Sequence, residues 1–305
     1  GARVDAEGPL VDLLVRDGRI VSAAAGEGVP STEDSPSPES TPSQEGLRLI
    51  ELDGRVVLPG FIESHIHLDK AFLEERRPNL SGTLQDVIAI TLELKKSVTN
   101  KDIRERSERT LRLLVRHGAT RLRAQVEVDP IVGLKGMEAT LELREACAGI
   151  ADIQIVVFPQ EGIEQQPGTE ELMREAMRMG GDAVGGIPYN DTDPERHLDI
   201  VFGLAAEFGC GIDLHIDFSD DPGECVIESV ARRTGASGLE GKVVVAHLTS
   251  LGAMDGERAA RVIGAIAKAE ITVILLPATD LFLNGRGGDP PPASGGSPGC
   301  ANSSP

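Results

Sequence analysis

Short apolar runs alternate with longer amphipathic segments along most of the chain. The apolar runs predict seven β-strands, at residues 60–65, 120–128, 152–159, 182–187, 211–216, 242–246 and 271–276. Apolar residues at helical spacing predict helices at 84–96, 102–116, 137–147, 170–179, 195–208, 223–234 and 256–268. Strand and helix in regular succession indicate a parallel sheet with right-handed crossovers. We therefore expect the α/β class, as an incomplete (β/α)8 TIM-type barrel of about seven strands over residues 59–284.

The first 58 residues carry a different pattern. Alternating apolar residues predict short strands in three places, at 10–25 around the turn Asp17-Gly18, at 47–52 and at 55–58. We expect residues 1–58 to form part of a small β-domain. Residues 26–46 are rich in serine, proline and glutamate, a composition that cannot form a core, so we expect a disordered insertion there.

The alternating pattern stops at Gly285. Residues 285–305 have low complexity and no apolar periodicity, so they cannot supply an eighth strand of the barrel. A regular array that ends in such a tail leads us to expect a chain that is truncated or frame-shifted at its C-terminal end.

Composition and charge narrow the class of protein. Hydrophobic residues make up 40% of the 305 positions and charged residues 26%, as in ordinary globular proteins. A net charge of −19, with no Trp, one Tyr and seven Phe, disfavours binding to nucleic acid or to an anionic membrane surface. The four cysteines are far apart without a C-x-x-C pair, and the N-terminus resembles no secretory leader. These features favour a reducing compartment, the cytoplasm.

Four of the six histidines fall at the ends of predicted strands. His65 and His67 form an H-x-H pair at the end of the first barrel strand, where alternate residues point the same way. His215 and His247 end the fifth and sixth strands. In a parallel barrel all strand C-termini lie on the face that carries active sites. Because neutral imidazoles are common ligands of zinc-like ions, this placement predicts a hydrolytic metal site.

Several other polar residues have ordinary structural interpretations. His117 is interpreted as a C-capping residue of a helix and His197 as a surface residue of another. Asp280, at the end of the seventh strand, is interpreted as a turn or cap residue. Asp69 and Lys70 follow the H-x-H pair and fit either the barrel mouth or a solvated ion pair.

The sequence around these histidines resembles the amidohydrolase superfamily. Residues 56–72 resemble the first-strand signature of that superfamily, with the text VVLPGFIESHIHLDKAF. Four later motifs are similar, in order and spacing, to cytosine deaminases and amino-triazine hydrolases: FPQEGI at 158–163, GGIP at 185–188, IDLHID at 212–217 and VAHLTS at 245–250. The resemblance extends from about residue 11 to residue 286.

The resemblance implies roles for individual residues. His65, His67 and His215 match metal-binding histidines, and His247 matches a catalytic histidine that orients hydroxide and polarises the substrate. Gln160 matches a substrate-binding glutamine, although it equally fits a strand-end amide that satisfies loop backbone. The implied activity is cytosine deaminase-like hydrolysis of a C–N bond in a cyclic amidine or nitrogen heterocycle, with one divalent ion, Zn or Fe, as cofactor.

Two departures from the family pattern leave alternatives open. Phe218 stands where family deaminases carry a proton-shuttling glutamate, and Asp217, on the same strand face as His215 by parity, becomes the candidate catalytic carboxylate. The aspartate of the family's eighth strand has no counterpart among the seven predicted strands. Hydrolysis of a different cyclic amide or N-alkylamine stays open, as does an impaired fragment that only binds metal. The partner expected is a small nitrogen heterocycle, and a homo-oligomer is compatible with the sequence.

Overall fold

The computed structural model describes residues 1–4, 7–25 and 48–284. The chain divides into two compact units, Gly1–Gly60 and Phe61–Pro305. The predictions made for residues 26–46 and 285–305 lie outside the described residues.

The N-terminal unit contains the predicted hairpin. Strands β1 (Val11–Arg16) and β2 (Arg19–Ala25) pair antiparallel. The two turn residues, Asp17 and Gly18, have φ values of 52° and 72°. Positive φ at both central residues is what a two-residue turn of type I′ requires, and its twist matches that of the strands. The Asp-Gly signal therefore predicted this hairpin correctly.

The strands predicted at 47–52 and 55–58 are wrong over the described residues. The backbone turns at Asp53 and Gly54, both with positive φ. After this turn, residues 55–58 form one isolated β-bridge, between Val56 and Arg3, in place of a strand. Alternation of apolar residues indicates a strand only where a neighbouring strand is present to pair with it.

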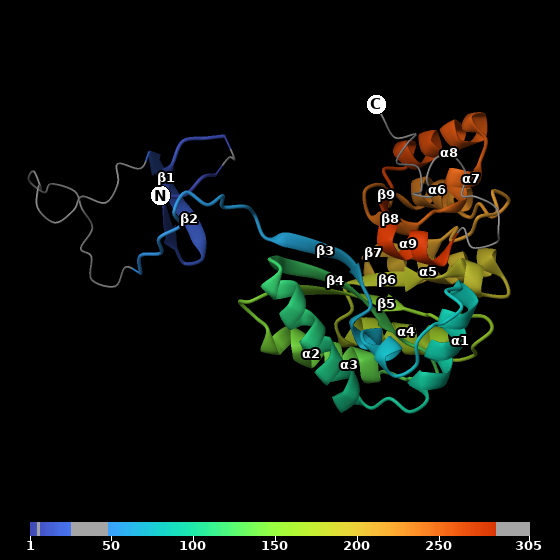
Figure 1. Ribbon diagram of the computed structural model, residues 1–305. Helices are drawn as coiled ribbons and strands as arrows, with labels where there is room; N and C mark the ends of the chain where they lie inside the picture. The colour runs from blue at the N-terminus through green and yellow to red at the C-terminus, as the bar shows by residue number, and fades with distance from the viewer. Residues whose placement is uncertain (5–6, 26–47, 285–305) are drawn as a thin grey trace, which may run out of the picture. The chain divides into compact units, whose positions relative to one another are not determined.

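The C-terminal unit is built on one parallel sheet of seven strands, nearly closed into a barrel (Figure 1). The strands neighbour one another in sequence order, as right-handed βαβ units require. Their bounds are β3 (Phe61–Ile66), β4 (Ala119–Glu127), β5 (Asp152–Phe158), β6 (Ala183–Gly186), β7 (Gly211–Ile216), β8 (Val243–His247) and β9 (Thr272–Ile274). The predicted fold class and the seven strands are confirmed.

Over the described residues, all seven predicted helices are present, and two short helices occur in addition. The helices are α1 (Leu84–Lys95), α2 (Asn100–Arg116), α3 (Lys135–Ala146), α4 (Thr169–Met179), α5 (Pro194–Phe208), α6 (Ile227–Ser237), α7 (Ser250–Ala253), α8 (Gly256–Lys268) and α9 (Pro277–Leu283), with 3₁₀ turns η1 (Leu68–Lys70), η2 (Leu73–Glu75) and η3 (Pro188–Asn190). Among the described helices, none is long and apolar enough to cross a membrane.

One helix begins later than its apolar spacing predicts. Helix α6 starts at Ile227, four residues after the predicted start at Gly223. The carboxylate of Asp221 accepts a hydrogen bond from the N–H of Gly223, which holds the chain in a turn at that point. The local side-chain bond thus competes with the first turn of the helix.

The core lies between the sheet and the helices that cover it. Strand residues such as Val157 and Leu214 are fully buried against Met173 of α4 and Leu198 of α5. Each such side chain contributes about 1.5–3 kcal/mol relative to exposure. The GGIP motif packs closely here, because a Cβ on Gly186 would lie 2.7 Å from Cδ2 of Leu214. Glycine at this position lets β6 approach its neighbours.

Candidate metal centre

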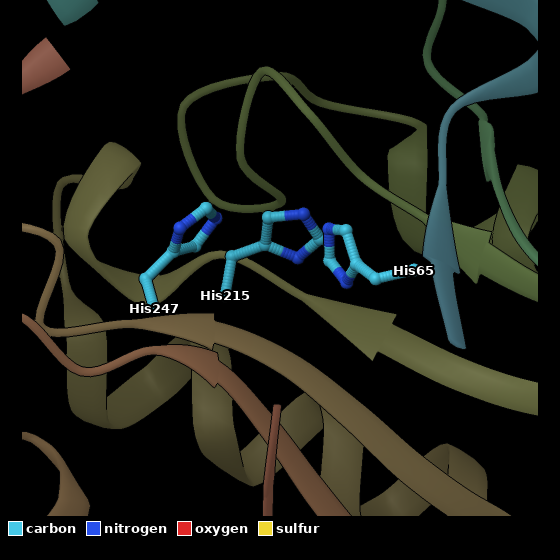
Figure 2. A group of neighbouring side chains, drawn as sticks. All are labelled: His65, His215 and His247. Carbon is cyan, nitrogen blue, oxygen red and sulfur yellow. The ribbon is translucent and has the colours of Figure 1, made fainter. Parts of the chain in front are cut away.

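The four histidines predicted to converge do come together. His65 lies on β3, His67 directly follows that strand, His215 lies on β7 and His247 ends β8. The ring centre of His215 is 4.5 Å from that of His65, 5.2 Å from that of His67 and 5.3 Å from that of His247. The ring centres of His65 and His247 are 5.8 Å apart, so the rings of His65, His215 and His247 (Figure 2) form a compact triangle. The C-terminal ends of the strands therefore hold one imidazole cluster.

Burial makes these imidazoles neutral ligands. Loss of hydration on burial, reinforced by the neighbouring histidines, lowers the pKa of His65 to about 3 and the pKa values of His67 and His215 well below the ordinary range. The buried Nδ1 atoms of the same three residues have no hydrogen-bond partner within the described structure. Ligand nitrogens of His65, His215 and His247 lie within 4.8 Å of one another. This donor set fits a single divalent ion of the zinc type.

His67 is the fourth member of the cluster. Its Nε2 lies 3.1 Å from the Nε2 of His215, so the two nitrogens point at the same space. Three histidines are enough for a catalytic site that keeps one position open. His67 and His247 are thus alternatives for the third ligand beside His65 and His215.

His247 is held from two sides. Its Nδ1 donates a hydrogen bond to Oδ1 of Asp280 at 2.8 Å, and the Asp280 side chain is fully buried. The ring of Phe218 stacks on the imidazole, with centres 4.0 Å apart and planes 20° from parallel. His247 also has a φ of 73°, which is uncommon for a residue other than glycine. The backbone and both neighbours therefore determine where its Nε2 faces.

Asp280 has the predicted turn role and a second one that the sequence did not reveal. Its Oδ2 accepts from the backbone N–H of Leu276 at 3.2 Å, at the start of α9. Its other oxygen holds His247. No local signal could have revealed the second contact, because it joins α9 to the end of β8.

Asp217 is near the histidines in sequence, but its carboxylate is engaged elsewhere. Its oxygens accept hydrogen bonds from the N–H groups of Val226 at 2.7 Å and Ile227 at 3.1 Å, at the start of α6. Burial raises the pKa of Asp217 to about 6. The parity argument assumed an extended strand, yet β7 ends at Ile216 and Asp217 has a φ of 50°. Asp217 is absent from the described lining of the cavity above the histidines.

That cavity has a volume of about 480 Å³. Its lining includes three of the four histidines, His67, His215 and His247. Its polar lining includes Lys70 of η1 and the predicted Gln160, and Nζ of Lys70 donates to Oε1 of Gln160 at 2.6 Å. The apolar lining residues are Leu73, Leu84, Val87, Ile88, Ile187, Phe218, Ala278, Phe282 and Leu283. Further polar groups come from Glu74, Arg77, Asn79, Thr91, Tyr189 and Thr279. A flat, partly apolar ring with acceptor groups on one edge suits such a lining.

The other two histidines have structural roles. His117 is the C-capping residue of α2, as predicted. The surface position predicted for His197 is wrong, because the residue is fully buried. Its Nδ1 donates to Asp191 at 2.8 Å, and its Nε2 accepts from the N–H of Ile187 at 3.0 Å. His197 precedes Val201 by four residues and shares the apolar face of α5, a spacing that was available in the sequence.

Comparison with known proteins agrees with this geometry. Residues 83–299 match the amidohydrolase family. N-isopropylammelide isopropyl amidohydrolase of Pseudomonas sp. (strain ADP) is 33% identical over 205 residues, covering 65% of this chain and 51% of that protein. Pterin deaminase of Rhizobium rhizogenes (strain K84) is 30% identical over 251 residues, covering 82% and 57%.

A solved structure extends the comparison to the fold. The crystal structure of 5-methylcytosine deaminase from Klebsiella pneumoniae, liganded with 5-fluorocytosine, aligns with a TM-score of 0.82 at 29% identity. The alignment covers 96% of this chain and 69% of that one. The chain spans about half the length of the curated relatives it matches, 51% and 57%. Since the family match covers well over half of its 305 residues, the chain belongs to the amidohydrolase family.

Proposed function

We propose that this chain provides the metal site and substrate pocket of a hydrolase that cleaves a non-peptide C–N bond in a small nitrogen heterocycle. The observation that carries the proposal is the cluster of four histidines, of which His67, His215 and His247 line a cavity of about 480 Å³. The relatives' names point to the same chemistry, since ammelide, pterin and 5-methylcytosine are all nitrogen heterocycles. A cytosine deaminase-like reaction is the leading form.

The metal would be held by His65, His67 and His215, as the family resemblance implies, with His247 beside them. We propose one divalent ion, Zn or Fe. When bound, such an ion lowers the pKa of a coordinated water so that hydroxide forms near neutral pH. The buried, unpartnered Nδ1 atoms of the three ligands support this assignment.

The protein's own groups orient the substrate. Oε1 of Gln160 accepts from Lys70, so the amide N–H₂ of Gln160 is the end available to the substrate. Together with the ammonium of Lys70, this end presents donors to a ring carbonyl or an acceptor ring nitrogen. The Nδ1–H of His247 donates its hydrogen bond to Asp280. Its other ring nitrogen, Nε2, is therefore a hydrogen-bond acceptor, and it faces the other histidines. Nε2 of His247 can therefore hold or receive a proton during attack on the ring.

A second candidate reaction is hydrolysis of an N-alkylamine or of another cyclic amide. Phe218 lines the cavity and cannot deliver a proton to a leaving amine. In the same cavity, the apolar wall residues Leu84, Val87 and Ile88 can receive an alkyl substituent. The 33% identity to an enzyme named for N-isopropylammelide favours this candidate. Metal binding without turnover is the third alternative.

The proposal also includes the cellular location and the partners of the enzyme. The composition supports a cytoplasmic enzyme without nucleic-acid or membrane partners, and a homo-oligomer is compatible with it.

The test is a substrate panel on protein reconstituted with Zn²⁺ or Fe²⁺. Cytosine, 5-methylcytosine, pterin and N-isopropylammelide are incubated separately, and released ammonia and released alkylamine are quantified. Ammonia from the first three supports deamination, whereas isopropylamine from the last supports the second candidate. A full complement of bound metal with no product from any compound would refute hydrolysis of this substrate class by the chain. The His65→Ala/His67→Ala double variant is the negative control.

A further inference from the structure

Helix α1 forms one wall of the cavity but packs little against the rest of the protein. Leu84, Val87, Ile88 and Thr91 on this helix line the cavity, and all four are only partly buried. The one fully buried residue of the helix is its last, Lys95. An apolar face that borders a cavity gains little from burial. The position of α1 (Figure 1) is therefore set mainly at its C-terminal end.

Lys95 is fixed there by three buried carboxylates. Its Nζ donates to Glu127 at 2.6 Å, to Asp129 at 2.5 Å and to Glu161 at 2.7 Å. The lysine side chain is 3% exposed, and none of the three carboxylate side chains exceeds 6%. We call these four residues the Lys95 cluster. Charge-assisted hydrogen bonds in a dry environment are strong and directional, so the ammonium holds the end of α1 at a defined place.

Glu127 also reaches the recognition side of the cavity. While Oε1 accepts from Lys95, its Oε2 lies 3.4 Å from Nζ of Lys70. Lys70 in turn donates to Oε1 of Gln160. The backbone N–H of Glu127 donates to Asp69 at 2.8 Å, which fixes the strand end next to η1. A continuous polar chain thus runs from the wall helix through Lys95, Glu127 and Lys70 to the amide of Gln160.

We propose that Lys95 and Glu127 are positioning residues, which hold the α1 wall and the side-chain amide of Gln160 in a fixed arrangement relative to each other. The substrate ring then lies between a fixed apolar wall and a fixed pair of donors. Glu127 connects the two parts of the network, because it is the member of the Lys95 cluster that also pairs with Lys70. The inference rests on the proposed function only in taking the cavity as the substrate site.

A matched pair of variants separates this role from general stabilisation. Glu127→Gln and Asp129→Asn each remove one carboxylate charge from Lys95, but only Glu127 also contacts Lys70. Two readouts need no substrate: hydrogen exchange of the α1 amides, and the NMR signals of the Gln160 side-chain amide. Glu93→Gln, at an exposed residue of α1 that pairs with Arg77, serves as the baseline.

We expect both cluster variants to accelerate exchange in α1 by about tenfold or more, since local opening follows local stability. Only Glu127→Gln should shift or broaden the Gln160 amide signals. If Asp129→Asn changes those signals as strongly, the cluster merely stabilises the fold and the proposal is overturned. Unchanged Gln160 signals in Glu127→Gln overturn it too. Should Glu127→Gln fail to fold, Glu127→Asp keeps the charge but is too short to reach both lysines, and the same results are expected.

A binding measurement links the network to recognition. The probe is 5-fluorocytosine, followed by ¹⁹F NMR titration of the metal-loaded protein. Glu127→Gln should weaken binding about tenfold relative to Asp129→Asn, and equal affinities of the two variants would contradict the proposal. If the wild-type chain does not bind the probe, the proposed substrate class fails for this compound. The α1 exchange and Gln160 signals then decide the positioning role by themselves.

Discussion

His247 and Asp280 form a buried hydrogen-bonded pair, with Nδ1 of the histidine 2.8 Å from Oδ1 of the aspartate. The carboxylate fixes which imidazole nitrogen carries the proton and so directs Nε2 toward the other histidines. Phe218 stacks on the ring and prevents it from rotating out of that orientation. Together with the left-handed backbone of His247 at the end of its strand, these two contacts fix the orientation of the imidazole ring.

The first prediction concerns this pair. In Asp280→Asn the amide cannot accept from both His247 and the N–H of Leu276, because one of its two atoms is now a donor. Because His247 is proposed to accept a proton beside the metal ligands, we expect kcat/KM to fall by about 10–100-fold, while the metal content stays that of the wild type. Turnover of the substrate that the panel identifies and elemental analysis measure the two quantities. Asp255→Asn, an exposed N-cap replaced by an equally good one, should keep the kcat/KM of the wild type.

The second prediction concerns the ligands themselves. The protein should bind about one divalent ion, and the His65→Ala/His67→Ala variant should bind almost none because one ligand would remain of the three proposed. Elemental analysis of purified, metal-reconstituted protein gives the content directly. His117→Ala removes a histidine that caps α2 and should leave the metal content unchanged. Equal metal in the double variant and the wild type would refute the ligand assignment.

The third prediction concerns Phe218. Phenylalanine cannot transfer protons, so we expect slow deamination of cytosine and a gain of about 10²–10⁴ in kcat/KM for Phe218→Glu. Phe218→Leu separates loss of the His247 stack from gain of a carboxylate. Turnover of cytosine near the ordinary value of about 10 s⁻¹ with Phe218, and no gain from Glu, would show that this position does not govern proton transfer.

The fold could be predicted from local pattern because each strand and helix has its own periodicity. Strand β7 has the bounds that its apolar run predicts, and the histidines meet because parallel strands end on one face. The failures have a common physical cause. Strands expected at 47–52 and 55–58 needed a partner strand that the described structure lacks, and Asp217 left the strand geometry that parity assumed.

The contacts that complete the site join residues far apart in sequence. Lys70 donates a hydrogen bond to Gln160, which is 90 residues away in the sequence, and Lys95 donates one to Glu161, which is 66 residues away. Such pairs depend on how crossover loops fold over the strand ends, which single-residue patterns do not encode. His197 is different, because its helical spacing from apolar residues of α5 predicts a buried position. The surface position was expected only because histidine is a polar residue.

The last prediction concerns stability and pH at the buried pair Asp191–His197. Burial alone would raise the pKa of Asp191, but hydrogen bonds from His197 and from the backbone N–H groups of Ile163, Glu164 and Gln165 outweigh it and lower the pKa well below the ordinary value. A depressed carboxyl pKa adds stability that is fully present above the unfolded-state value of about 3.9 and fades as pH falls below it.

Asp191→Asn should therefore lower the free energy of unfolding by about 1.5–3 kcal/mol at pH 7, the range for a hydrogen bond to a charged group. The difference from wild type should stay constant down to about pH 4 and shrink below that, since protonation then removes the same charge from the wild type. Urea unfolding from pH 7 to pH 3 measures it. Asp199→Asn, an exposed change on helix α5, which also carries His197, should stay within about 0.5 kcal/mol throughout. A pH-independent deficit for Asp191→Asn would mean that packing, not the ionised carboxylate, supplies the stability.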